Sequence, residues 1–294
     1  MFETLSDFLK ERGIEWFAPV PLACCRVVRP YLLERAGIAS GSAVMLAVPY
    51  LTRACLTPDR NLSAYAVPRD YHGFFDGLFG ELLPFLRKRF PAFRFAGFAD
   101  HSPIAEVEAA ACAGLGVIGE NGLLLTEPYS SYVFLGELIT DAPIPCSPVS
   151  AAHCPSCGRC REICPAEQCG GCLSALTQKK GELTSGEQEA LLRYGSVWGC
   201  DLCQEVCPYT RAALERGSIF SRVPYFAQQT LPHLTAELLD RMSDTEFAAR
   251  AYAWRGRKTI RRNLILMENA RKFSENSAEG GMKSHRDRRE EGPC

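Results

Sequence analysis

The chain has 294 residues, of which 47% are hydrophobic, and its formal net charge is −1. A chain of this size can bury the core of one sizeable domain and a smaller one, and its near-zero charge excludes a global attraction to nucleic acid. No apolar run reaches the length that a bilayer requires. Fifteen cysteines without the apolar region of a secretory signal indicate a reducing compartment, so we expect a cytoplasmic protein.

Apolar periodicity predicts helices that alternate with strands over about the first 145 residues. Helices are expected before Gly13, over 73–90 with a potential kink at Pro84, and over 104–113. Strands are expected over 43–48, 93–99, 123–126 and 132–140. This order predicts a layered α/β (α+β) fold.

Prolines at 143, 145 and 148 mark a boundary before a cysteine-rich segment. We expect an α/β catalytic domain at 1–145 and a two-cluster segment at 146–215, whose metal centres substitute for a core. A helical segment at 216–273 and a disordered polar tail at 274–294 would follow. Residues 255–262 hold five cations and no acid, which predicts either a solvated helix face or a nucleic-acid contact.

Two cysteine motifs lie in the second half of the chain. The first has spacings of two, two and three residues before a proline, at Cys154, Cys157, Cys160, Cys164 and Pro165. The second repeats the end of that pattern, at Cys200, Cys203, Cys207 and Pro208. In bacterial ferredoxins three such cysteines hold one [4Fe–4S] cluster and the fourth crosses to a second cluster. The pattern favours iron–sulfur over zinc, and a disulfide framework is weaker still.

Two such clusters need eight cysteines, whereas the motifs supply seven, because Val197 stands where the eighth would fall. The ligands that we predict for the first cluster are Cys154, Cys157, Cys160 and Cys207. Those for the second are Cys164, Cys200, Cys203 and one intervening cysteine, with Cys172 preferred to Cys169. The alternative is a single cluster with three idle thiols.

From about residue 43 to residue 270 the chain resembles epoxyqueuosine reductases, the cobalamin-dependent iron–sulfur family that completes queuosine in the tRNA anticodon loop. Besides the cysteine motifs, the resemblance is carried, in order, by Tyr65-Ala66, Arg69-Asp70-Tyr71-His72, Asp100 with Pro103 and Glu106, 113–116 with Gly119 and Asn121, 131–137 with Asp141, Cys172-Leu173-Ser174 with Leu176-Thr177, Gly199-Cys200-Asp201, and Arg262-Asn263.

The resemblance implies a nitroreductase-like domain that carries cobalamin and a ferredoxin-like domain with two [4Fe–4S] clusters. Electrons from an external low-potential donor would pass through the clusters to cobalt, and an epoxide on the modified base would lose its oxygen as water. tRNA is the implied partner, and no membrane is involved.

Asp100 matches the family's proton donor. Such a carboxyl needs a raised pKa, which burial against the macrocycle would provide. From local sequence alone, Asp100 is instead an N-cap of the helix that begins near Pro103. The residues implied to contact cobalamin are Ser63, His72, Asp100, Leu124, Leu135 and Ser174.

Val107 and Glu120 depart from the family pattern, which commonly has Arg and Lys there. Many members also extend into helical repeats that help to hold tRNA, whereas this chain ends in a short polar tail. Two other functions therefore stay open. One is a related corrinoid iron–sulfur reductase of a small molecule, and the other is a two-cluster electron carrier for a partner protein.

Overall fold

The structure is a computed structural model that describes residues 1–166 and 171–270. Cys169 and the tail expected to be disordered lie outside these residues. The N-terminal lobe is built on a four-stranded sheet of order β1-β2-β6-β3, with antiparallel pairing throughout. Its strands are β1 (Phe17–Pro21), β2 (Ser42–Pro49), β6 (Val133–Thr140) and β3 (Phe95–Phe98). The predicted mixture of helical and strand layers is confirmed.

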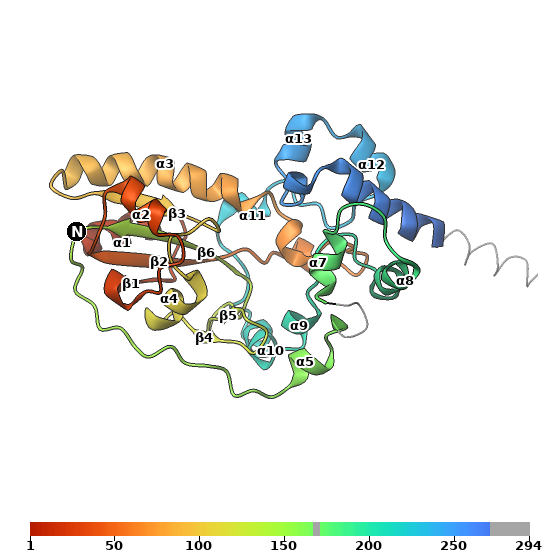
Figure 1. Ribbon diagram of the computed structural model, residues 1–294, viewed down its shortest axis with the longest axis horizontal. Helices are drawn as coiled ribbons and strands as arrows, with labels where there is room; N and C mark the ends of the chain where they lie inside the picture. Colours follow the sequence, from red (N-terminus) through yellow and green to blue (C-terminus); the bar gives the residue numbers. More distant parts are fainter. Residues whose placement is uncertain (167–170, 271–294) are drawn as a thin grey trace, which may run out of the picture.

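One face of the sheet is covered by α3 (Tyr71–Arg89) and α1 (Phe2–Lys10), and Figure 1 shows α3 running above the strands. Two glycines allow the close approach of α3. A Cβ at Gly136 would lie 2.4 Å from the Phe75 ring, and one at Gly97 would lie 2.3 Å from Phe79. Helix α3 continues through Pro84 to its last turn.

The opposite face is covered by α4 (Glu106–Cys112), whose consecutive alanines 109–111 are buried against the sheet. A two-stranded ribbon of β4 (Val117–Ile118) and β5 (Leu124–Leu125) follows it, and α2 (Pro30–Ala36) lies earlier in the chain. Val133 and Leu135 belong to β6, an interior strand, yet they are only half-buried. The described residues therefore leave part of this sheet face uncovered.

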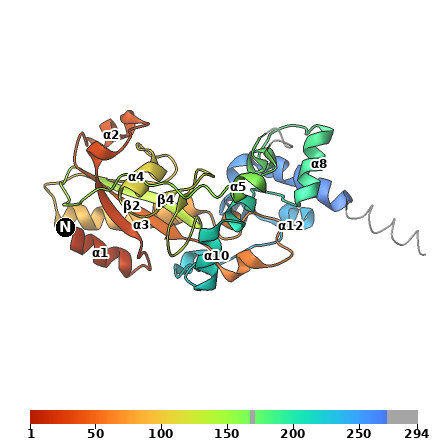
Figure 2. The same cartoon turned by 90° about the horizontal axis from the view of Figure 1, so that it is seen from below.

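The rest of the described chain is helical, and most of it forms a second lobe (Figure 2). Its helices are α5 (Arg159–Glu162), α7 (Leu173–Thr177), α8 (Ser185–Tyr194), α9 (Leu202–Glu205), α10 (Pro208–Glu215), α11 (Pro224–Ala227), α12 (Ala236–Arg241), α13 (Asp244–Ala248) and the helical residues 257–270. Short 3-10 turns occur at Leu22–Cys24, Arg53–Leu56, Ala64–Ala66 and Ala253–Arg255. Within the described ranges, no helix has both the length and the apolar character needed to cross a membrane.

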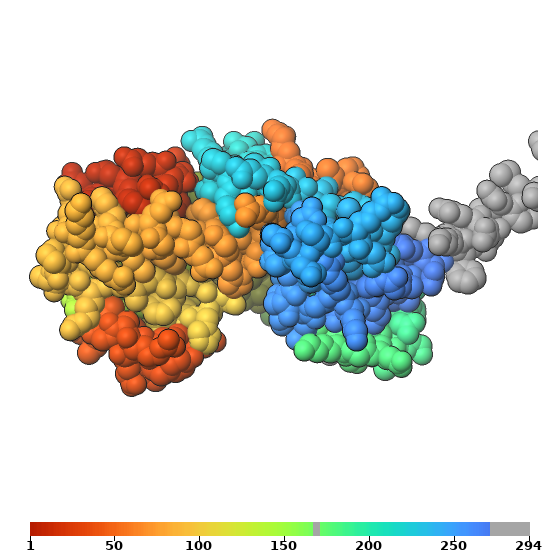
Figure 3. Space-filling model, turned by 90° about the horizontal axis from the view of Figure 1, so that it is seen from above, coloured from red at the N-terminus to blue at the C-terminus, as the bar shows by residue number. Residues whose placement is uncertain are grey.

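Residues 61–70 connect the two lobes. Leu62 forms a parallel bridge with Trp198, and Arg69 forms an antiparallel bridge with Arg250. The Asp70 N–H donates to the Ala249 carbonyl at 2.9 Å. This part of the expected N-terminal domain thus packs on C-terminal residues. Figure 3 shows a notch between the lobes, with orange-red and yellow segments on one side and blue and green segments on the other.

Candidate functional site

Four cysteines from the two motifs line one cavity: Cys154, Cys157, Cys160 and Cys207. About 420 Å³ of empty space, part of it open to solvent, lies between them. The other walls include Leu125, Pro155, Pro208 and Tyr209. Cysteines that lie far apart in the chain thus face a common, largely apolar space.

Backbone pairing holds the first motif in place. The Cys154 N–H donates to the Ile118 carbonyl at 2.9 Å, and the Ile118 N–H donates to the Ala152 carbonyl at 2.7 Å. The chain before the motif therefore lies alongside β4. The Glu120 N–H also donates to Cys154 Sγ at 3.3 Å. Hydrogen bonds to cysteine sulfur are one way in which proteins set the potential of a cluster.

A second group of cysteines lies around α9. Burial raises the pKa of Cys203, and the Cys164 and Cys172 thiols raise it further, although a hydrogen bond with Asn121 opposes this shift. Burial raises the pKa of Cys200 to about 12, with a smaller contribution from Cys172. Cys172 therefore lies within electrostatic reach of both other thiols. A bound metal would favour their thiolates by supplying positive charge.

The cysteines of both groups offer free thiols as donors. In residues 1–166 and 171–270, no three His, Cys, Asp or Glu side chains form a group that could hold one metal ion. A [4Fe–4S] cube takes one thiolate at each iron. The chemistry of the donors therefore fits an iron–sulfur cluster.

Val197 has a packing role where the ferredoxin pattern would have a cysteine. Its side chain is fully buried, and its N–H donates to the Asn61 carbonyl at 2.8 Å. Its carbonyl accepts a hydrogen bond from Asn263 Nδ2 at 2.9 Å, and the same amide group donates to the Thr177 carbonyl. This position belongs to the core, so Val197 leaves no room for a ligand there.

Asp100 lies two residues after the end of β3, on an exposed loop. Its backbone is left-handed, with φ of 63°, and its N–H donates to Glu106 Oε1 at 3.2 Å. Its side chain is 67% exposed, so the chain alone does not provide the expected burial. The interpretation of Asp100 as a helix cap is wrong, because α4 begins at Glu106 and its N-cap is Ala105.

His72 lies beside Asp100 at the start of α3. Its Nε2 is 3.6 Å from Asp100 Oδ2, and its Nδ1 is 2.8 Å from Asp70 Oδ1. The hydrogen bond with Asp70 raises the pKa of His72, and Asp100 adds to this effect. The Tyr71 ring stacks on Phe134 with centroids 4.3 Å apart, which fixes the first turn of the helix. Asp100 therefore faces a histidine that readily takes a proton.

The other residues that were expected to contact cobalamin lie in two groups. Leu124 is buried and Leu135 half-buried, and both pack on the α4 side of the sheet. Ser63 and Ser174 belong to the other group. The Ser174 carbonyl accepts a hydrogen bond from the Thr177 hydroxyl, which also accepts from the Gly199 N–H, and a Cβ at Gly199 would lie 2.4 Å from Ser63 Cβ.

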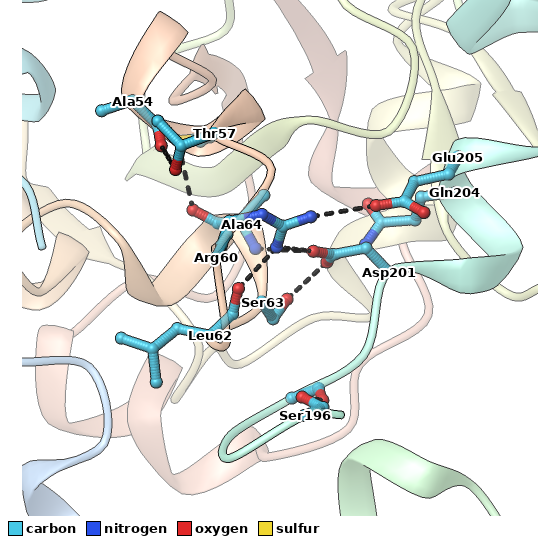
Figure 4. Close-up of polar contacts among 12 residues, drawn as sticks. Ala54, Thr57, Arg60, Leu62, Ser63, Ala64, Ser196, Asp201, Gln204 and Glu205 are labelled. Atoms are coloured by element: carbon cyan, nitrogen blue, oxygen red, sulfur yellow. Dashed lines mark hydrogen bonds and ion pairs between the residues drawn. The ribbon is translucent and has the colours of Figure 1, made fainter. Parts of the chain in front are cut away.

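A polar network surrounds Asp201, between Cys200 and Cys203 (Figure 4). The buried Asp201 carboxylate accepts hydrogen bonds from Arg60 Nη1 at 2.5 Å, from the Ala64 N–H at 2.7 Å and from the Ser63 hydroxyl. The Ser63 hydroxyl is thus engaged within the protein. The network fixes the second cysteine motif against residues 60–64.

Most of the cationic run at 255–262 has internal partners. Arg257 donates to the carbonyls of Leu239 and Met242 at the end of α12, and Arg261 forms an ion pair with Asp240. Arg262 donates to the carbonyls of Lys179 and Gly181, and Arg255 donates to that of Gln178. These partners hold Arg255, Arg257 and Arg262 against the protein, whereas Arg261 stays exposed beside its partner. Lys258 is exposed.

Glu137 enters the sequence analysis only as the last residue of the matched segment 131–137. It is fully buried on the α4 side of β6, next to Glu106. Burial raises the pKa of both carboxyls, that of Glu106 to about 7. The strand predicted at 132–140 is otherwise apolar, so a glutamate at one of its inward positions is the sequence signal that could have identified Glu137.

Comparison with known proteins identifies the family. No family model matches the chain. The chain is 34% identical to the epoxyqueuosine reductase of Gloeobacter violaceus over 221 residues, which cover 71% of this chain and 68% of that protein. It is also 34% identical to the epoxyqueuosine reductase of Listeria monocytogenes over 207 residues, 67% of this chain and 54% of that protein. The matches thus span from about half to two thirds of these relatives' length.

Solved structures agree. The epoxyqueuosine reductase of Streptococcus thermophilus has a TM-score of 0.73 and 23% identity, covering 91% of this chain and 80% of that chain. Another epoxyqueuosine reductase, solved with an epoxyqueuosine-modified tRNA-Tyr stem loop, has a TM-score of 0.71 and 25% identity, covering 90% and 80%. The extent of the Gloeobacter match and the shared fold lead to one conclusion: the chain belongs to the epoxyqueuosine reductase family.

Proposed function

We propose that this chain is a cobalamin- and iron–sulfur-dependent reductase that converts epoxyqueuosine in tRNA to queuosine. The observation that carries the proposal is the cavity lined by cysteines of both motifs, in a chain that belongs to this family. The Gloeobacter and Listeria relatives bear the name of this activity. A solved relative holds a tRNA stem loop with the modified base.

Two [4Fe–4S] clusters would be held by the two groups of cysteines. The proposed ligands of the first are Cys154, Cys157, Cys160 and Cys207, and those of the second are Cys164, Cys172, Cys200 and Cys203. An external low-potential donor would supply the electrons, and we expect the reaction in the reducing cytoplasm.

Cobalamin would occupy the uncovered part of the sheet. Half-buried Val133 and Leu135 offer an apolar surface for the corrin, and His72 with Asp100 offers polar groups. Leu124 would support that surface from below. Ser174 would contribute from the second lobe, and Ser63 would act by holding the Asp201 network. When bound, cobalamin supplies strongly reducing chemistry at cobalt.

Asp100 would protonate the oxygen as it leaves carbon. Its exposed carboxyl can reach a substrate at the surface, and a cofactor and substrate packed over it would remove it from water. His72, held by Asp70, would orient the Asp100 carboxyl from the other side.

The test uses the full chain, reconstituted anaerobically with iron, sulfide and cobalamin. Visible spectroscopy should give both corrin and iron–sulfur absorption, and tRNA that contains epoxyqueuosine should yield queuosine on nucleoside analysis after reduction. Corrin binding without conversion would favour reduction of a small molecule instead. Clusters without corrin binding would favour an electron carrier.

A further inference from the structure

A pair of carboxyl groups lies directly behind Asp100. Glu137 stands on the interior strand β6, opposite Phe98 and Met45, and is 0% exposed. Among the residues that the structure describes, neither carboxyl oxygen makes a hydrogen bond of regular geometry, and the polar side chains that the carboxyl faces are Ser102 and Glu106. Glu106, in the first turn of α4, is the neighbouring acid.

The surroundings disfavour the ionisation of both carboxyls together. Burial raises the pKa of Glu106 to about 7, although hydrogen bonds with the Asp100 N–H and with Glu137 oppose the shift, and Arg29 also lowers it. Burial raises the pKa of Glu137 well above its usual range, and the Glu106 charge raises it further. The other titratable neighbours, Cys25 and Tyr71, supply no positive charge. Two neighbouring desolvated acids retain a proton at neutral pH.

This proton is held next to the candidate donor. The hydrogen bond from the Asp100 N–H to Glu106 Oε1, at 3.2 Å, joins the pair to the Asp100 loop. The left-handed backbone of Asp100 accompanies this contact. Glu106 thus contacts the backbone of the loop that carries the Asp100 carboxyl, and Glu137 lies behind it in the sheet.

The proposed reaction consumes two protons. Converting an epoxide to an alkene breaks two C–O bonds, forms a C=C bond and releases the oxygen as water. The change requires two electrons, which the external low-potential donor supplies, and two protons on the oxygen. A single Asp100 carboxyl supplies one of them.

We propose that the Glu106–Glu137 pair supplies the second proton, which it passes to Asp100 after Asp100 has protonated the departing oxygen. This proposal rests on the proposed function. Glu106 and Glu137 act through Asp100 and need not touch the substrate. The same carboxyls would also make the reaction sensitive to pH near neutrality.

The first experiment measures the pair without catalysis. Infrared difference spectra of the full chain between about pH 6 and pH 8 isolate it, because ordinary carboxyls are already ionised in that interval. The wild type should lose a carboxylic-acid carbonyl signal, and Glu106→Gln and Glu137→Gln should each diminish or abolish that loss. The control Glu108→Gln, an exposed acid on the same helix paired with Arg26, should leave it intact. A signal unchanged in both test variants would overturn the proposal.

The second experiment measures conversion of epoxyqueuosine tRNA in single turnovers as a function of pH. In Glu106→Gln the side-chain amide retains an oxygen for the Asp100 N–H but carries no titrating proton. This variant should therefore slow conversion about 100-fold and flatten the pH profile near neutrality, with cofactor content and tRNA affinity unchanged. Glu137→Gln serves as the second test if Glu106→Gln does not fold.

The outcomes separate the alternatives. If Glu106→Gln converts substrate at the wild-type rate and only Glu106→Ala is impaired, Glu106 merely positions the loop and the proposal fails. Absence of conversion by the wild type would overturn the proposed function itself. Equal conversion by the wild type and Glu106→Gln would overturn the proton source alone.

Discussion

The Arg60 guanidinium forms an ion pair with the Asp201 carboxylate, with Nη1 and Oδ2 2.5 Å apart and with the side chains 15% and 3% exposed. A charge so far from water requires such compensation. Arg60 also reaches Glu205 at 2.9 Å. The ion pair therefore fastens the second cysteine motif to a segment of the N-terminal half.

Replacing Arg60 by Met should leave the Asp201 charge without its counter-ion. We expect the free energy of unfolding to fall by about 3 kcal/mol, as is typical when one partner of a buried pair is removed. Chemical denaturation, monitored by circular dichroism, measures this free energy. The control Arg222→Met removes an arginine that is 81% exposed and 3.8 Å from Glu15, so it should have little effect. Equal losses in the two variants would mean that the remaining donors Ser63, Ala64 and Gln204 satisfy Asp201.

Cys172→Ala should remove one cluster and leave the other. Anaerobically reconstituted wild type should contain about eight iron atoms per chain and the variant about four, measured by iron and labile sulfide analysis. Cys146→Ala, a free thiol outside both motifs, should retain the wild-type content. Full iron content in Cys172→Ala and a loss in Cys169→Ala would assign the eighth ligand to Cys169.

Asp100→Asn should retain corrin and cluster absorption but slow turnover by about 100-fold or more. Asn has nearly the same size and, like Asp, tolerates the left-handed backbone observed here. The substitution thus removes the proton and preserves the loop. Turnover at the wild-type rate would exclude Asp100 as the donor.

Lys258→Gln should weaken tRNA binding most at low salt. Loss of one phosphate contact should reduce the slope of log affinity against log salt by about 0.7–0.9, measured by filter binding at several salt concentrations. Arg257→Gln should instead lower thermal stability, because Arg257 holds the carbonyls at the end of α12. An unchanged slope in Lys258→Gln would remove this surface from the RNA-binding site.

The raised pKa of Glu106 predicts how stability depends on pH. An acid whose folded-state pKa lies above its unfolded value contributes stability that is lost as pH rises through the folded value. Stability should therefore decline between about pH 4.5 and pH 7, and Glu106→Gln should flatten this decline. The pKa of Glu108 is lowered by its hydrogen bond with Arg26. Its contribution to stability therefore changes in the opposite direction and is lost as pH falls. Denaturation midpoints across this pH interval provide the measurement, and the same slope in Glu106→Gln and the wild type would refute the prediction.

Local sequence predicted the regular elements where periodicity was strong. The run at 43–48 became β2, and the run at 132–140 became β6. Strand β1 was missed because Pro19 and Pro21 interrupt it, which an edge strand tolerates. The prediction that Asp100 caps a helix was wrong because α4 begins later in the chain than the apolar pattern indicated.

The site was harder to predict where it depends on tertiary neighbours. Cysteine spacing alone suggested which thiols could share a cluster, and that assignment stays a prediction until iron is measured. The contact between Glu106 and Glu137 joins a helix to a distant strand, so no local pattern encodes it. Likewise, the internal partners of Arg257 and Arg262 are carbonyls, which carry no sequence signal.

The placement of Cys160 and Cys207 on one cavity has a consequence for the lifetime of the protein. A cluster bound there would tie together the two ends of a long loop that contains α7 and α8, and such a cross-link limits the freedom of the unfolded chain. Oxidative loss of iron would remove that restraint, and it would also stop electron transfer. Loss of the cluster in air should therefore make this loop more susceptible to proteases than it is in the protein with its cluster.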